Sequence, residues 1–422
     1  MRTYDPRQAV QFRMARLAAQ SLLVALLLTT CIPAQESNSP ASTGSDLPAG
    51  GGSPELTPSA LTTSAAASPK SDAPPPFGAE REFSTDFSLH SIDYAEILSG
   101  GPPKDGIPSI DEPHFETIPQ ADEWLEPQEP VILFQTGQDA RAYPLQVLVW
   151  HEIVNDFVNG EPILITFCPL CNTAIAFARN VNGRILDFGT TGRLRFSNLI
   201  MYDRQTESWW QQATGEAVAG ELTGTQLEFL SVPIIAWDQF KRAYPSGSVL
   251  SRDTGYVRPY GENPYVGYDD VNNTPFAYRG PATPDRLAPM ARVLALDLNG
   301  EVVAFPYDAL ETVRVVNENV GGEEIVVFWE PGTASALDSA ALAAGRDVGA
   351  AVAYSRTVNG RVLTFTFDSS AFIDQETNTR WDILGQALEG ELAGERLASV
   401  VAVDHFWFSW VAFKPETQVY QP

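Results

Sequence analysis

The stretch Ile163-Leu-Ile-Thr-Phe-Cys-Pro-Leu-Cys-Asn172 joins a continuous apolar run to a Cys-x-x-Cys pair. Because no turn residue interrupts the run and several of its members are β-branched, it predicts a buried strand over residues 162–167. That strand delivers Cys168 and Cys171, two of only three cysteines in the 422-residue chain. We therefore expect the chemistry of the protein at the end of this strand.

The flanking sequence alternates between strand and helix patterns. Residues 129–134 are apolar and predict a strand, and the proline of Ala142-Tyr-Pro144 suits the first turn of a helix that continues to about Asn155. Downstream, Asn182-Gly183 separates two further strand-like stretches and is a strong hairpin signal. These patterns predict mixed α/β local structure on both sides of the cysteines.

Several short motifs occur twice in the same order. Ala142-Tyr-Pro144 returns as Ala304-Phe-Pro306, and Arg179-Asn-Val-Asn-Gly-Arg184 returns as Arg356-Thr-Val-Asn-Gly-Arg361. We interpret this as an α+β fold made of two tandem repeats of one mixed α/β unit, about 130–250 and 293–420, packed into a single body. The second copy has Glu330, Thr333 and Val313 where the first has Cys168, Cys171 and His151, so we expect the second copy to be degenerate and structural.

The N-terminal part predicts export. Four arginines precede the apolar run Leu22–Leu28, and Leu28-Thr-Thr-Cys31 resembles a bacterial lipobox, so residues 1–31 are expected to be a signal peptide. A lipid on Cys31 would anchor the protein to a membrane outside the cytoplasm. The alternative is an ordinary signal peptide and a secreted protein. Residues 32–82, rich in Ser, Pro and Ala, predict a disordered linker to a body at 83–422.

Charge and cysteine content exclude two classes of protein. The formal net charge of −26 argues against a nucleic-acid partner, because phosphate binding requires clustered Lys and Arg. An exported protein with so few cysteines has no disulfide framework. The remaining pair therefore needs a local explanation.

Cys168 and Cys171 could act as a thiol-redox pair or bind a soft metal. His151 lies on the predicted helix before the strand, and an S₂N set of these three residues would suit copper or zinc. We expect a strand after Cys171, which removes the helix dipole that activates thioredoxin-like thiols. The alternatives are a structural disulfide and an internal core histidine.

Polar and aromatic residues gather after the cysteines, among glycines. Such clusters suit a pocket for a small anionic ligand. The alternative is that they pair with one another, which together with a structural disulfide would make the protein a non-catalytic binding module. The candidate ligand-binding residues are Asn172, Arg193, Arg195, Asn198, Asp203, Arg204, Trp210, Arg252 and Asp253.

The longer motifs resemble a known family. They are His151-Glu-Ile-Val-Asn155, Thr166-Phe-Cys-Pro-Leu-Cys-Asn-Thr-Ala174, Asn198-Leu-Ile-Met-Tyr-Asp-Arg-Gln-Thr-Glu-Ser208 and Ser251-Arg-Asp-Thr-Gly255. The chain is similar to the large prokaryotic domain-of-unknown-function family 3179 (DUF3179) from about residue 100 to the C-terminus. The resemblance implies export or membrane attachment for many members and no activity.

Overall fold

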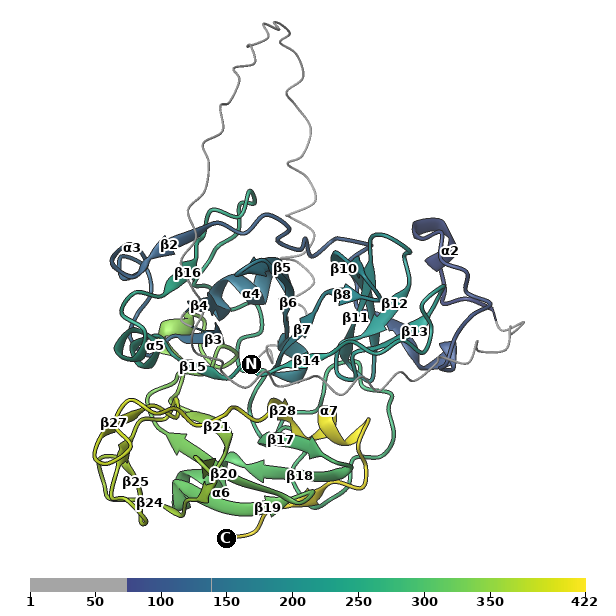
Figure 1. Cartoon of the computed structure of the whole chain (residues 1–422). Coiled ribbons are helices and arrows are strands. Elements are labelled where there is room, and N and C mark those ends of the chain that lie inside the picture. The colour runs from purple at the N-terminus through teal and green to yellow at the C-terminus, as the bar shows by residue number, and fades with distance from the viewer. Residues whose placement is uncertain (1–73, 138) are drawn as a thin grey trace, which may run out of the picture. The chain divides into compact units, whose positions relative to one another are not determined.

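The apolar run before the cysteines forms strand β6 (Glu161–Cys168), as the sequence predicts. The computed structural model of the protein describes residues 74–137 and 139–422. In it, β6 pairs antiparallel with β5 (Ile153–Val158) and with β7 (Thr173–Ala178), and β14 (Phe229–Leu230) completes the sheet (Figure 1). Cys168 lies opposite Thr173 in the β6–β7 register, so the two cysteines occupy the tight connection between these strands.

Two five-stranded sheets accompany this cysteine-bearing sheet in the first half of the described chain. The first has the order β1 (Ile97–Ser99), β10 (Phe188–Arg195), β11 (Asn198–Asp203), β12 (Trp209–Gln211) and β13 (Glu216–Ala219). The second has the order β15 (Ile234–Ala236), β3 (Pro130–Thr136), β4 (Asp139–Pro144), β16 (Ser248–Leu250) and β2 (Phe115–Thr117). The hairpin predicted at Asn182-Gly183 is confirmed as β8 (Asn180–Val181) and β9 (Arg184–Ile185).

The C-terminal half forms four further sheets. One has the order β28 (Val403–Phe406), β17 (Arg292–Leu298), β18 (Glu301–Pro306) and β29 (Gln418–Val419). A second has the order β19 (Val315–Val320), β20 (Glu323–Glu330) and β21 (Ala350–Ser355). The others are β22 (Thr357–Val358) with β23 (Arg361–Val362), and β24 (Phe365–Phe367), β25 (Phe372–Asp374), β26 (Arg380–Trp381) and β27 (Ala387–Glu389) in that order.

The helices of the described residues are short. None of the helices within 74–137 and 139–422 has the length and apolar character needed to cross a membrane. The α-helices are α2 (Ala79–Glu82), α3 (Ile118–Ala121), α4 (Leu145–His151), α5 (Trp237–Ala243), α6 (Tyr307–Val313) and α7 (Trp407–Val411). The 3₁₀ turns are η1 (Tyr94–Glu96), η2 (Pro169–Cys171) and η3 (Leu342–Ala344).

The predicted α+β fold of two tandem mixed units is wrong, because the described part of the chain is mostly β and its strands are divided among eight separate sheets. Helix α4, which the sequence pattern extended to Asn155, shows why the fold class was predicted wrongly. It ends at His151, since Glu152 adopts a left-handed conformation with φ of 59° and Ile153 already begins β5. The sequence pattern thus overestimated helix length and missed a strand.

The predicted signal peptide, the anchor at Cys31 and the linker up to residue 73 lie outside the described residues. The end of the predicted linker belongs to the folded part of the chain. There α2 buries Ala79, and Glu82 forms an ion pair with Arg193 on β10.

A long segment, residues 251–291, joins β16 to β17 without a helix or an extended strand. Irregular connections of this length are uncommon in compact folds and are often functional. Five of its large apolar side chains are exposed: Tyr256, Val257, Val266, Val271 and Phe276. We call residues 251–291 the covering segment, because it contacts the cysteine site described next.

Candidate functional site

Cys168 and Cys171 are both free thiols, and both are buried, with 2% and 0% of their surface exposed. Pro169 starts the single 3₁₀ turn between them, and Asn172 ends it in a left-handed conformation with φ of 52°. The turn brings both sulfurs toward the same acceptor: the carbonyl oxygen of Ser197 lies 3.8 Å from Cys168 Sγ and 3.5 Å from Cys171 Sγ. The Pro169–Cys171 turn therefore holds the two thiols together as a dithiol.

Asn198 holds the Cys171 sulfur. Its side-chain nitrogen donates to Cys171 Sγ at 3.4 Å and to Gln212 Oε1 at 2.7 Å. Its side-chain oxygen accepts from Gln211 Nε2 at 2.6 Å and from the backbone nitrogen of Ala213 at 2.9 Å. Because both ends of the amide have partners, its orientation is fixed and it presents an N–H to the sulfur.

The turn that delivers Asn198 is strained. Phe196 and Ser197 connect β10 to β11, and both have positive φ, 54° and 66°. A two-residue hairpin turn of this type normally uses Asn or Gly, since other residues pay on the order of 1 kcal/mol for the left-handed conformation. The turn places the Ser197 carbonyl and the Asn198 amide beside the sulfurs, so backbone strain coincides with the candidate site.

The two thiols differ in acidity. Burial raises the pKa of Cys168, and its hydrogen bond to Cys171 raises it further. Burial also raises the pKa of Cys171, but hydrogen bonds from Cys168, Ser409 and Asn198 outweigh burial and lower this pKa below its ordinary value. Cys171 is therefore the more acidic of the two thiols, and Cys168 is the thiol that donates to it.

A buried carboxyl, that of Glu152, also acts on the two thiols. Burial raises its pKa to about 8, and its charge acts on both cysteines, raising the pKa of each. Near neutral pH Glu152 is therefore mostly protonated and adds little negative charge beside the thiolate. No sequence pattern singles out Glu152 beyond its position next to His151.

The C-terminal part of the chain supplies two residues that the sequence analysis missed. His405 lies on β28, and its Nδ1 is 2.8 Å from Thr173 Oγ1 and 3.0 Å from Ser409 Oγ. Ser409 in turn lowers the pKa of Cys171 through a hydrogen bond. Burial lowers the pKa of His405 to about 3, so this imidazole is neutral. Residues more than 230 positions downstream cannot be assigned to a site from local sequence alone.

His151 does not join the cysteines, which corrects the predicted S₂N set. Its Nδ1 is 2.8 Å from the carbonyl oxygen of Pro108, and its Nε2 is 2.7 Å from the Tyr260 hydroxyl. With both ring nitrogens occupied, His151 has none left to bind a metal. Throughout the described part of the chain, no three His, Cys, Asp or Glu side chains are arranged to hold a metal ion.

The arginines predicted to bind an anion are engaged in separate ion pairs. Arg193 pairs with Glu82 at 2.7 Å, and Arg195 pairs with Glu96 at 2.7 Å. Arg204 contacts two carboxylates, Asp105 and Asp111, each at 3.2 Å. The structure therefore does not bring these three arginines together around one ligand.

The remaining predicted residues also lie apart. Trp210 donates from Nε1 to Asp203 Oδ2 at 2.9 Å inside the β11–β12 pair. Arg252 donates to Gln146 Oε1 at 2.9 Å, and Asp253 is exposed, 3.4 Å from His114. Of the predicted ligand-binding residues, Asn198 contacts a cysteine sulfur and Asn172 directly follows Cys171.

The covering segment closes the site. The Tyr268 hydroxyl donates to the Leu170 carbonyl oxygen, between the two cysteines, at 3.0 Å. Ser197 Oγ donates to the carbonyl oxygen of Phe276 at 2.5 Å. The charges of Glu152 and Cys168 act on Tyr265 of the same segment. Because both sulfurs are almost fully buried, a reactant reaches them only when part of the packing around them opens.

Comparison with known proteins identifies the family. The model of the DUF3179 family, described as a protein of unknown function, matches residues 104–417. The chain belongs to the DUF3179 family. This confirms the resemblance seen in the motifs around the cysteines. No curated protein and no solved structure matches this DUF3179 chain significantly.

Proposed function

We propose that Cys168 and Cys171 of this DUF3179 protein form a thiol–disulfide redox couple, with Cys171 as the attacking sulfur. The observation that carries the proposal is the asymmetry of the pair. Asn198, Ser409 and Cys168 all donate to Cys171, whose pKa falls although burial opposes it, whereas the pKa of Cys168 rises. A low-pKa thiol beside a resolving thiol is the arrangement that dithiol exchange requires.

The reaction partner is a disulfide. The Cys171 thiolate attacks one sulfur of the partner, a Cys171–partner disulfide forms, the partner S–S bond breaks, and the leaving thiolate takes one proton. Cys168 then loses its proton and attacks Cys171, releasing the second partner thiolate, which takes that proton. Two electrons pass from the protein to its partner, together with one proton from Cys168, while the proton on the first leaving thiolate comes from solvent, and Cys168–Cys171 becomes a disulfide.

The expected location of this chemistry is outside the cytoplasm. The proposal rests on the basic and apolar segments before Cys31 and on the lipobox-like Leu28-Thr-Thr-Cys31. Mass spectrometry of the protein from membranes of an expressing bacterium tests it. A lipid-modified Cys31 at the N-terminus, lost in Cys31→Ala, is expected, and a protein that retains residues 1–30 in the soluble fraction would contradict it.

Thiol trapping tests the redox couple. The purified protein is equilibrated with mixtures of reduced and oxidised glutathione, quenched in acid, alkylated and analysed by peptide mass spectrometry. We expect Cys168 and Cys171 to interconvert reversibly between dithiol and disulfide. In Cys168→Ser, oxidised glutathione should remain as a mixed disulfide on Cys171, whereas Cys171→Ser should trap at least tenfold less on Cys168, because its thiolate fraction is small.

Two outcomes would refute the couple. One is a pair that stays reduced under all glutathione mixtures unless the protein is denatured. The other is equal trapping on either single cysteine, which would remove the asymmetry. Metal analysis of the same preparations distinguishes the redox couple from a metal site. Stoichiometric copper or zinc that is lost in both serine variants would favour a metal site over dithiol exchange.

A further inference from the structure

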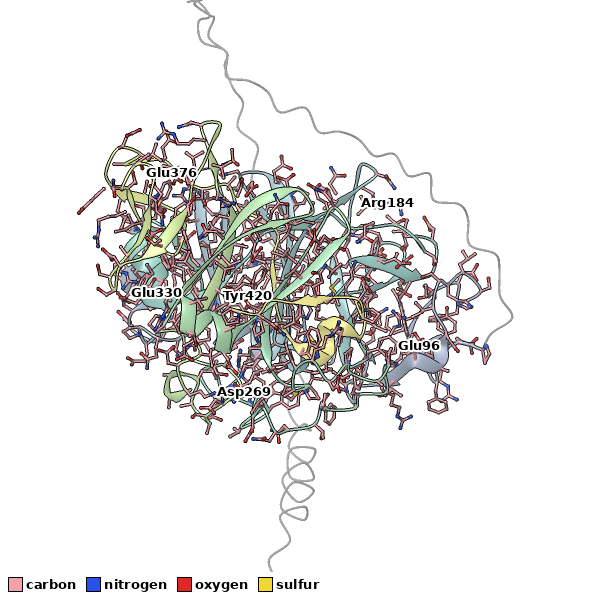
Figure 2. The ribbon with its side chains drawn as sticks, turned by 90° about the horizontal axis from the view of Figure 1, so that it is seen from below. Glu96, Arg184, Asp269, Glu330, Glu376 and Tyr420 are labelled. Atoms are coloured by element: carbon pink, nitrogen blue, oxygen red, sulfur yellow. The ribbon has the colours of Figure 1, made fainter. Side chains whose placement is uncertain are left out.

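A second candidate site is lined by α5 and by residues of the C-terminal half, none of which belongs to the cysteine site. A cavity of about 490 Å³ opens between α5, the end of β20 and the β24–β25 hairpin. Figure 2 labels Glu330, the last residue of β20, which lines this cavity. Its volume is within the range of small-molecule sites, and its walls combine aromatic side chains with charged ones.

A buried amide in this cavity lacks a partner. Gln239, on α5, is only 4% exposed, and its side-chain oxygen accepts from the backbone nitrogen of Ala236 at 2.9 Å. Its side-chain nitrogen has no hydrogen-bond partner. An unsatisfied buried donor costs on the order of 1–3 kcal/mol, so a donor that lines a cavity indicates an acceptor supplied from outside.

An arginine of the same cavity also lacks an acidic partner. Arg314 follows α6 and stacks over Trp329 at 4.4 Å, with the Phe367 ring 6.0 Å away. Among the described residues Arg314 forms no ion pair within 4.0 Å, although its charge acts on Glu330 from farther away. Stacking on an aromatic ring fixes the guanidinium plane, which prepares it for a planar, bidentate acceptor such as a carboxylate.

The charge balance of the cavity favours an anion. Three arginines line it, but Arg242 pairs with Asp238 at 2.7 Å and Arg380 pairs with Asp368 at 3.4 Å, so Arg314 is the lining guanidinium without an ion pair. Burial raises the pKa of Asp382 to about 6 and also raises that of Glu330, so both lining carboxyls hold their protons more strongly than usual. A cationic ligand would instead have to approach the unpaired guanidinium of Arg314.

The apolar part of the cavity indicates the rest of the ligand. Phe367, Phe372 and Trp381 line it, and Leu388 is an exposed apolar residue on its wall. We propose that this cavity binds a small organic acid, whose carboxylate is received by Arg314 and the Gln239 amide and whose apolar body lies against the aromatic side chains.

Ligand-detected NMR and calorimetry on the full chain test this site with four probes. Hexanoate and benzoate carry a carboxylate and an apolar body, phosphate lacks the apolar body, and benzylamine reverses the charge. We expect one hexanoate or benzoate per chain, with a dissociation constant on the order of 1 mM, as befits ligands of this size. Phosphate and benzylamine should bind at least tenfold more weakly.

Two variants assign the binding to the proposed residues. Arg314→Gln removes the unpaired guanidinium, and Gln239→Glu keeps the acceptor for Ala236 but replaces the free donor with an acceptor. Each should weaken hexanoate binding about tenfold, the effect of losing one hydrogen bond to a charged group. Arg361→Gln, which removes an exposed arginine paired with Glu391 at 3.4 Å, is the matched control and should not change it.

The proposal is overturned if neither hexanoate nor benzoate binds at a concentration 20-fold above the expected dissociation constant. It is equally overturned if benzylamine binds more tightly than benzoate, or if phosphate binds as well as hexanoate. It is also overturned if Arg314→Gln and Gln239→Glu bind both carboxylates as the unmodified chain does. Thermal melting of both variants confirms that they are folded before their affinities are compared.

Discussion

The side-chain nitrogen of Asn198 lies 3.4 Å from the sulfur of Cys171, and the opposite end of the same amide accepts from Gln211 and from Ala213. This hydrogen bond joins the β10–β11 hairpin to the turn after β6. It makes one of two neighbouring thiols more acidic, because an N–H donor stabilises the thiolate more than the thiol. The proposed redox asymmetry therefore depends on an amide whose orientation is fixed by other strands.

Replacing Asn198 tests this dependence. Asn198→Asp keeps an acceptor for Gln211 and Ala213 but removes the donor and adds a negative charge, so the pKa of Cys171 should rise. We expect the rate of Cys171 alkylation by iodoacetamide at neutral pH to fall about tenfold, measured by peptide mass spectrometry across a pH series. Asn180→Asp, in the exposed turn at β8, is the control and should leave the rate unchanged.

Glu152 should make stability depend on pH. Its folded-state pKa of about 8 exceeds the ordinary 4.5, so between these values the folded state holds a proton that the unfolded state has lost. Stability from this group is therefore fully present below pH 4.5 and is lost as the pH rises to 8, at up to about 1.4 kcal/mol per unit. Denaturant unfolding of Glu152→Gln should lack this decline, so that the variant is the more stable protein at pH 8. An equal decline in both proteins would show that Glu152 does not titrate in this range.

Local sequence was sufficient for the elements that carry the cysteines. A continuous apolar run predicted β6 almost to its ends, and Asn182-Gly183 predicted the β8–β9 hairpin, because each signal acts within a few residues. The fold class was wrong for a related reason. Helix α4 ends at His151 because Glu152 adopts a left-handed conformation, and no feature of the neighbouring sequence predicts this conformation.

The composition of the site depended on contacts between distant segments. His151 is close to the cysteines in sequence, yet its ring is held by Pro108 and Tyr260. His405 and Ser409 are far away in sequence, yet both reach the turn after β6. The spacing Cys-x-x-Cys indicates a dithiol by itself, but its partners follow from how β28 packs against β7, which a single sequence does not determine.

Opening the covering segment should expose the thiols. Tyr268→Phe removes the hydroxyl that donates to the Leu170 carbonyl and leaves that acceptor unpaired, which should lower stability by about 1 kcal/mol. We expect native-state alkylation of Cys171 to become several-fold faster. Tyr278→Phe is a matched control within the same segment, because its hydroxyl donates to Pro281 of the segment itself. Equal rates in both variants would show that the segment does not limit access.

Asp203 and Trp210 were predicted to bind a ligand, and their contacts predict a structural role instead. Asp203 accepts from the backbone nitrogen of Thr206 at 2.7 Å and from Trp210 Nε1 at 2.9 Å. The same pair of contacts occurs around Asp374, which accepts from the backbone nitrogen of Thr377 at 2.6 Å and from Trp381 Nε1 at 3.0 Å. The second set has no cysteine beside it, so the arrangement serves a turn rather than the dithiol.

Asp203→Ala and Asp374→Ala should therefore behave alike. Each leaves a buried Trp N–H and a turn amide without their acceptor, and each should lower the free energy of unfolding by about 3 kcal/mol. Neither should change the alkylation rate of Cys171 in the folded protein, measured at a temperature well below both melting transitions. A rate that changes in Asp203→Ala but not in Asp374→Ala would instead assign Asp203 to the redox site, since the loss of a turn acceptor is common to both variants.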